Sequence, residues 1–321
     1  ATLLAGLKEK NIAGAGREID ATINTSSGNT VYNLGVVEPY AFNRDIDFII
    51  GTSYRLRDYT STASYELTTI NLNTGFRYEL TDEIDHKITI DYDVKDYTIS
   101  DSNTVSSNIA TSAGTNVEIA INNNFIYNKL NSLIRPSEGT YISFNNSISP
   151  ITNDDNGYIQ NIVVHKIYYK QTNNIFSVQS KFGNIFSLQN SEIKVDNKFA
   201  LGGRWLRGFD SFGAGPRDSR TSYYGGRNIA VTKLDYQRPL FRNSENPIDL
   251  NLFIDAGTVF DNKKKPNHSN ESIRSSYGVG IKFYSPIGPI GFSWAFPIQS
   301  ESYDIERMFL FSVGNLNWEI V

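Results

Sequence analysis

The chain is organised by long segments in which apolar and polar residues alternate. In the segment 87–94 one set of positions is mainly apolar and the other polar: Ile88, Ile90, Tyr92 and Val94 alternate with Lys87, Thr89, Asp91 and Asp93. The same period of two returns at 277–283 and 291–298, where small or polar residues occupy the second set of positions. Successive side chains of a β-strand point to opposite faces, so this pattern predicts strands with one apolar face.

Sixteen segments of this kind follow one another along the chain. They lie at 2–10, 17–25, 30–38, 46–58, 64–79, 86–99, 117–130, 139–149, 158–171, 175–188, 192–202, 227–238, 248–259, 274–284, 290–298 and 307–317. Several have nine or more residues, whereas strands of soluble sandwiches commonly have about five or six. A tilted membrane strand needs about 9–11 residues, and single-chain bacterial barrels have even strand numbers. The sequence therefore predicts an all-β fold, a transmembrane antiparallel β-barrel of 16 strands with both termini on one side.

Composition agrees with a barrel once the alternation is known. Mean hydropathy is −0.35, 20% of the 321 residues are charged, and no 18 consecutive residues are apolar, which excludes a helical membrane protein. In a barrel wall the lipid-facing and lumen-facing residues average to such values. The aromatic content of 13% suits interfacial girdles, although ordinary strands are also rich in aromatics.

No linker, charge block or change of composition divides the chain, so we expect residues 1–321 to form one barrel domain. The sequence starts at Ala1 within strand-like sequence, without an initiator Met or a signal peptide. We therefore expect that an upstream part has been removed.

Candidate chemistry is sparse. His86, His165 and His268 lack metal-ligand spacing, and there is no cysteine, so we expect neither a metal nor a cofactor. The glycines of 14–16 predict a turn rather than a dinucleotide site. The net charge of −4 and a single basic run at 263–265 argue against nucleic acid as a partner. A Ser/His/Asp set built from distant strands would leave no local signature, but nothing favours one, and we predict that the protein is not an enzyme.

The most diagnostic motif is Gly202-Gly203 followed by Leu206-Arg207-Gly208-Phe209. It resembles the tip of the sixth extracellular loop in the BamA-type barrel superfamily of POTRA-linked outer-membrane proteins. Further matches occur in the family's order: Asn11, Gly14 and Gly16 after the first strand, 136–139 before the eighth, Gly225, Gly226, Leu234 and Asp235 around the twelfth, 253–257 on the thirteenth, and 285–290 before the fifteenth. The resemblance covers essentially the whole chain.

Two features depart from the family pattern. The final strand of bacterial relatives usually ends the chain with an aromatic residue, whereas here Trp318 is followed by Glu319-Ile320-Val321. The periplasmic POTRA domains that precede the barrel in the family are not among these 321 residues. The chain thus resembles the membrane domain alone.

The resemblance implies an assembly factor in the outer membrane of a Gram-negative bacterium, with both termini periplasmic. Such a barrel folds and inserts β-barrel proteins without a cofactor, and its partners are unfolded outer-membrane proteins, the lipid bilayer and accessory lipoproteins. Insertion is expected at a lateral seam between the first and last strands, which involves Leu3, Ala5, Leu7, Phe309, Phe311, Val313 and Gly314. Gly314 either weakens that seam or makes room for a bulky neighbour.

Two other functions remain open. A translocation or two-partner secretion barrel of the same superfamily shares most of these motifs, and the number of upstream POTRA domains would separate it from an assembly factor. A diffusion porin would have an open lumen and would lack the Arg-Gly-Phe tip.

The same resemblance predicts that Arg207 folds back into the lumen. Asp255 shares its strand face with Asn251, Phe253 and Gly257, and Asp235 shares its face with Lys233 and Gln237. Both carboxylates should therefore point inward and bind Arg207. The alternative is a solvent-exposed loop arginine.

Overall fold

The computed structural model describes residues 3–12, 14, 16–26, 28–99, 105, 107–153, 156–219, 222–240, 247–261, 271–285 and 288–313. Strands dominate this part of the chain, and the helical elements are three single turns, η1 (Ala41–Asn43), α1 (Thr60–Ala63) and α2 (Ser107–Ala110). None of the helices in the described ranges is long and apolar enough to cross a bilayer.

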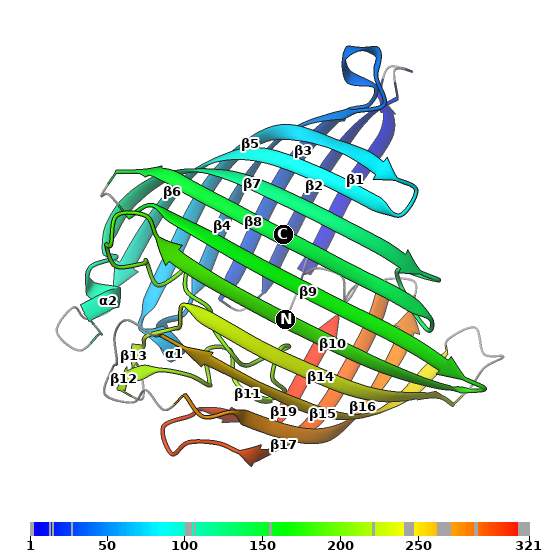
Figure 1. Cartoon of the computed structure of the whole chain (residues 1–321), viewed down its shortest axis with the longest axis vertical. Helices are drawn as coiled ribbons and strands as arrows, with labels where there is room; N and C mark the ends of the chain where they lie inside the picture. The colour runs from blue at the N-terminus through cyan, green and yellow to red at the C-terminus, as the bar shows by residue number, and fades with distance from the viewer. Residues whose placement is uncertain are drawn as a thin grey trace. The chain divides into compact units, whose positions relative to one another are not determined.

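Fifteen strands form one antiparallel sheet in which neighbours in space are neighbours along the chain (Figure 1). They are β1 (Leu3–Ile12), β2 (Arg17–Ser26), β3 (Asn29–Glu38), β4 (Asp47–Asp58), β5 (Tyr65–Thr81), β6 (Ile84–Ile99), β7 (Gly114–Leu130), β8 (Gly139–Thr152), β9 (Tyr158–Gln171), β10 (Asn174–Ser187), β14 (Asn228–Pro239), β15 (Ile248–Phe260), β16 (Arg274–Ser285), β17 (Gly288–Gln299) and β19 (Phe309–Val313). Two small pairs lie outside it: β11 (Gly208–Phe209) with β18 (Glu306–Arg307), and β12 (Arg217–Ser219) with β13 (Ser222–Tyr223). The sequence-based prediction of an all-β fold built from long antiparallel strands is confirmed.

The chain divides into two compact units. The first consists of residues 1–126, 144–162 and 185–198, and the second of residues 127–143, 163–184 and 199–321. The first unit contains β1–β6 and one end of each of β7–β10, together with the start of the long loop that follows β10. The second contains the other ends of those strands, the rest of that loop and the strands from β14 to β19. The single barrel domain expected from the sequence stays a prediction.

Alternation along the strands produces two chemically different faces. On β15 the side chains of Asn251, Phe253 and Asp255 are at most 4% exposed, whereas Leu252 and Ile254 between them are 47% and 51% exposed. We call the buried side the loop face, because the loop after β10 packs on it. The opposite face is apolar and uncovered, as expected for a surface that meets lipid.

One of the sixteen predicted strands is wrong. The segment 192–202 is part of the loop between β10 and β14 and contributes only isolated bridges, Phe199 to Gly226 and Leu201 to Ala214. The alternation of this segment does correspond to burial, since Ile193, Val195 and Leu201 are buried. These residues are buried within a loop, so the alternation here indicates burial and not a position in the sheet.

The two end strands of the sheet order are β1 in the first unit and β19 in the second. Within the described residues, β19 pairs with β17 from Phe309 opposite Trp294 to Val313 opposite Ile290. The predicted seam between β1 and β19 stays a prediction, and Gly314 lies outside the described residues.

Candidate functional site

The loop between β10 and β14 turns back sharply before its tip. Gly202 and Gly203 have φ values of 130° and 58°, which favour glycine. A Cβ on Gly202 would lie 1.9 Å from the carbonyl oxygen of Asp210, so the two arms of the turn pack backbone against backbone. Beyond this turn the tip residues Leu206, Arg207, Gly208 and Phe209 are all buried.

Arg207 lies between two carboxylates on adjacent strands. Its Nε and Nη2 atoms donate to the two oxygens of Asp255 on β15 at 2.7 and 2.6 Å, and its Nη1 donates to Asp235 Oδ1 on β14 at 2.9 Å. The three side chains are almost fully buried. A planar guanidinium is suited to this arrangement, because one edge binds a carboxylate bidentately while another donor reaches the second.

Further contacts hold the two carboxylates and the arginine in this arrangement. The Arg207 backbone N–H donates to Asp255 Oδ2 at 3.1 Å, and the guanidinium carbon lies 3.5 Å from the centre of the Phe253 ring. Asn251 donates to Asp235 Oδ1 at 2.8 Å. Burial opposes the charged guanidinium, but Asp235 and Asp255 hold the pKa of Arg207 above its ordinary value. The arginine is therefore charged throughout the physiological range.

Gly208 lets the tip approach the sheet. Its φ is 95°, and a Cβ there would meet Ser276 Cβ at 3.2 Å and Ala295 Cβ at 3.5 Å. The following residues tie the tip to the segment before the last strand: Gly208 and Phe209 pair with Arg307 and Glu306 in the β11 and β18 ladder. The backbone N–H of Asp210 also donates to the Ile305 carbonyl at 2.9 Å. The tip thus contacts the connection that leads directly into β19.

A second ionic cluster, in the first unit, holds the stem of the same loop. Lys95 Nζ on β6 lies 2.8 Å from both Glu118 Oε1 on β7 and Asp196 Oδ2 in the loop, and it donates to Asn197 Oδ1 at 3.1 Å. Tyr97 donates to Asp196, and Tyr158 on β9 donates to Glu118 at 3.1 Å. We call these residues the stem cluster.

Electrostatics in the stem cluster favour the ionised carboxylate of the loop. Burial acts to raise the pKa of Asp196, but the ion pair with Lys95 and the hydrogen bonds from Lys95 and Tyr97 hold it below its ordinary value. Sequence reasoning missed this cluster. The available signal was that Lys95 and Tyr97 continue the polar parity of Asp91 and Asp93, which places a lysine on the face that the loop covers.

The predicted seam residues lie on the two end strands of the sheet. Ala5 and Leu7 on β1 and Phe309 and Phe311 on β19 are exposed, and Leu3 and Val313 belong to the same strands. Each set belongs to a different unit. Within the part of the chain that the structure describes, no three His, Cys, Asp or Glu side chains are grouped as a metal site would require.

Comparisons with known proteins agree with this arrangement. Residues 11–316 match the Omp85 superfamily domain. The outer membrane protein assembly factor BamA of Neorickettsia risticii is 27% identical over 184 residues, covering 56% of this chain and 25% of that protein. BamA of Nitratidesulfovibrio vulgaris is 26% identical over 209 residues, covering 63% of this chain and 26% of that protein. The chain thus spans about a quarter of the length of these relatives.

The fold has a close counterpart among solved structures. The crystal structure of BamA from Haemophilus ducreyi lacking POTRA domains 1–3 superposes with a TM-score of 0.84 at 20% identity, covering 98% of this chain and 67% of that one. At this identity the likeness concerns the fold, which is that of an outer-membrane β-barrel. The fold class predicted from the sequence is confirmed.

We predict that Arg207→Ala destabilises the protein by roughly 3–5 kcal/mol, because two buried carboxylates lose their cation. Arg207→Lys should recover little of this loss, since an ammonium lacks the planar fork that engages both carboxylates. The measurement is urea-induced unfolding in lipid vesicles, followed by tryptophan fluorescence.

The matched control for this prediction is Arg307→Ala. Arg307 pairs with Asp210 of the same loop at 3.0 Å, but its side chain is 60% exposed. Exposed pairs contribute about 0–1 kcal/mol, so this variant should unfold almost as the parent does. Equal effects of the two alanine variants would contradict a special role for the buried arginine.

We predict that Lys95→Met destabilises the protein at pH 7 by a similar few kcal/mol, because Glu118 and Asp196 then share a buried site without a cation. The folded-state pKa of Asp196 is lowered, so its contribution is present above the ordinary carboxyl pKa of about 3.9 and is lost as the pH falls through the lowered value. The difference between variant and parent should therefore shrink below about pH 4, where the parent loses the contribution of Asp196.

Lys8→Met is the control for the stem cluster, because Lys8 pairs with Glu18 at 3.0 Å with 50% of its side chain exposed. It should change stability by less than about 1 kcal/mol at either pH. A pH-independent effect of Lys95→Met would show that lost packing, not lost charge pairing, dominates.

Proposed function

The chain belongs to the Omp85 superfamily and is an integral outer-membrane protein, and on that premise we propose that it is the membrane domain of an outer-membrane protein assembly factor. In this proposal it folds β-barrel proteins and inserts them into the outer membrane. Its partners are unfolded outer-membrane proteins, the lipid bilayer and accessory lipoproteins. Residues 1–321 act as one barrel domain, preceded by POTRA domains in the full protein.

The observation that carries the proposal is the buried loop tip. Arg207, held by two carboxylates, belongs to the tip motif by which the sequence resembles BamA-type barrels. A diffusion porin is expected to lack this Arg-Gly-Phe tip. The tip instead supports a barrel whose last strand needs positioning.

Insertion occurs at the seam between β1 and β19. A strand that lacks a complete ladder presents backbone N–H and C=O groups, which can pair with an incoming strand. The position of β19 supports this assignment, because it is an end strand of the sheet order and, among the described strands, pairs with β17 on one edge. The exposed Phe309 and Phe311 keep the strand in contact with lipid while its edge changes partner.

Arg207 acts in this mechanism as a positioning residue. The pairing of β11 with β18 ends at Arg307, and β19 begins two residues later at Phe309. A tip held by Asp235 and Asp255 therefore restricts where β19 can lie. Loss of the arginine should loosen the seam strand as well as the loop.

We expect that locking the seam stops insertion. The chain contains no cysteine, so pairs introduced at Ala5 or Leu7 and at Phe309 or Phe311 form disulfides without competing thiols. Oxidation should abolish assembly of a small β-barrel substrate into vesicles that carry the protein, and reduction should restore it, because the strands must separate to receive a new partner.

The matched control locks the wall instead of the seam. Leu234 and Ile254 are direct cross-strand partners on β14 and β15 and both are exposed, so a Leu234→Cys and Ile254→Cys pair should leave assembly unchanged when oxidised. Full assembly activity in the oxidised seam variants would reject lateral insertion. It would favour the translocation or secretion alternative, in which the substrate does not pass between β1 and β19.

A further inference from the structure

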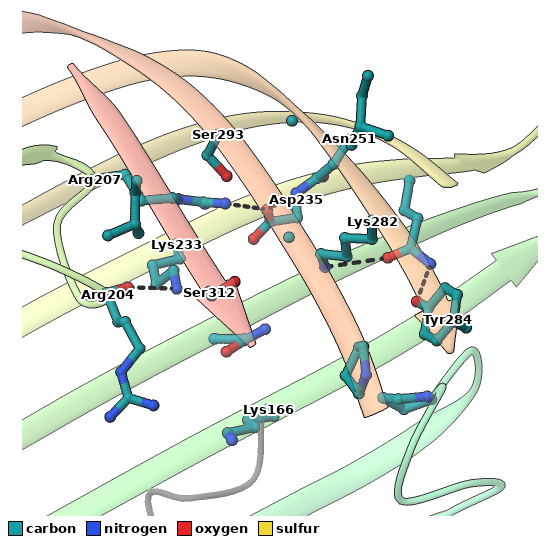
Figure 2. A pocket seen from close by; sticks show the side chains of 18 of the residues that line it. Lys166, Arg204, Arg207, Lys233, Asp235, Asn251, Lys282, Tyr284, Ser293 and Ser312 are labelled. Atoms are coloured by element: carbon teal, nitrogen blue, oxygen red, sulfur yellow. Dashed lines mark hydrogen bonds and ion pairs between the residues drawn. The ribbon is translucent and has the colours of Figure 1, made fainter. Parts of the chain in front are cut away.

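A cavity of about 100 Å³ lies on the loop face of the second unit, beside the Arg207 site. Its walls come from the strands β9, β10, β14–β17 and β19, from the segment before β8 and from the loop tip (Figure 2). About 10–15 Å³ of such cavity volume is enough for one water molecule, so the cavity admits a group of several heavy atoms. The Omp85 mechanism proposed above does not use this space.

The cavity is lined by many more cations than anions. Five basic residues line it, namely Lys166, Arg204, Arg207, Lys233 and Lys282, against the single carboxylate of Asp235. That carboxylate already accepts from Arg207 and Asn251. Lys233 and Lys282 come from different strands, and Lys233 Nζ also donates to the Arg204 carbonyl oxygen at 2.7 Å (Figure 2). Such an excess of positive charge in a concave, partly dehydrated site attracts an anion.

Two neighbouring groups specify what kind of anion fits. The Lys282 ammonium group has three N–H donors. Among the described residues its hydrogen-bond partner is Gln237 Oε1, at a long distance of 3.4 Å. Asn251 Oδ1 is a buried acceptor without a hydrogen-bond partner among the described residues, and the residue is 1% exposed. The amide orientation is fixed, because its Nδ2 donates to Asp235.

These two groups lie close together on the loop face. Asn251 is the cross-strand partner of Gly280, and Lys282 is two residues farther along the same strand, so the two side chains are diagonal neighbours. Gly280 keeps the space between them open, because it carries no side chain. A ligand placed there must offer acceptor oxygens to Lys282 and one hydrogen-bond donor to Asn251.

We propose that this cavity binds a phosphate group in a form that retains a P–OH, such as hydrogen phosphate or a phosphate monoester. Its anionic oxygens accept from Lys282 and Lys233, and its hydroxyl donates to Asn251 Oδ1. A phosphate monoester has a second pKa near 6, so a protonated fraction is present at neutral pH. The group is carried either by inorganic phosphate in solution or by a monoester lipid headgroup.

The test is a titration of the protein in phosphatidylcholine nanodiscs with inorganic phosphate, at constant ionic strength. Trp205 reports on the site, since its ring lies 5.9 Å from Lys233 Nζ. Phosphate should change the tryptophan fluorescence saturably, whereas sulfate, which has no proton to donate at neutral pH, should bind at least tenfold more weakly.

Variants test whether Lys282 and Asn251 are responsible for the phosphate-dependent change in fluorescence. Lys282→Met should weaken phosphate binding at least tenfold, and Lys282→Arg should retain most of it, which separates lost charge from lost folding. Asn251→Ala should remove the preference for phosphate over sulfate. Lys181→Met is the matched control: Lys181 Nζ lies 5.0 Å from the same Trp205 ring but does not line the cavity, so its removal should leave the affinity unchanged.

A second set of nanodiscs containing phosphatidic acid identifies the source of the phosphate. If the lipid headgroup enters the site, inorganic phosphate titrates at higher concentration there; if not, the two titrations coincide. Either result supports the site. Equal, unsaturable responses to phosphate, sulfate and chloride, or a phosphate affinity unchanged by Lys282→Met, would overturn the proposal.

Discussion

The guanidinium of Arg207, held between Asp235 and Asp255, is the interaction on which the arrangement of the second unit depends. Two carboxylates on adjacent strands cannot be buried side by side without a cation, because desolvation disfavours each charge and like charges repel. The loop tip supplies that cation, and Gly208 lets the backbone come close enough to do so. The glycine turn and the buried tip therefore both serve to bring a cation to the two buried carboxylates.

The anchored loop tip also restrains β19, the last strand of the sheet, through backbone pairing. The residues after Arg207 pair with β18, and β18 leads into β19, an end strand of the sheet order. An end strand next to a firmly held tip can change the partner along one edge while its entry point stays fixed. The stem cluster holds the same loop eleven residues earlier, by an independent ion pair in the first unit. The loop is thus anchored at both its stem and its tip.

The alternation of the sequence predicted most of this fold, because a period of two is a direct consequence of strand geometry. It also predicted that Asp235 and Asp255 share the loop face. It failed at 192–202, where Ile193 and Val195 alternate because they are buried residues of the loop itself. Alternation measures burial on one side and does not distinguish a sheet from a covering segment. The stem cluster was missed because Lys95, Glu118 and Asp196 are far apart in sequence, and only the fold brings them together.

Charge balance connects the tip to the neighbouring cavity. Arg207 with Asp235 and Asp255 leaves one negative charge in excess, and Lys233 and Lys282 interact electrostatically with Asp235 from the cavity side. The cations that favour an anion in the cavity therefore also stabilise the carboxylates that hold the tip. A ligand that binds these lysines weakens their electrostatic stabilisation of Asp235. Conversely, when the tip is held less firmly, the lysines interact more strongly with the ligand. Since linkage is reciprocal, occupancy of the cavity and insertion of the tip must influence each other by the same free energy.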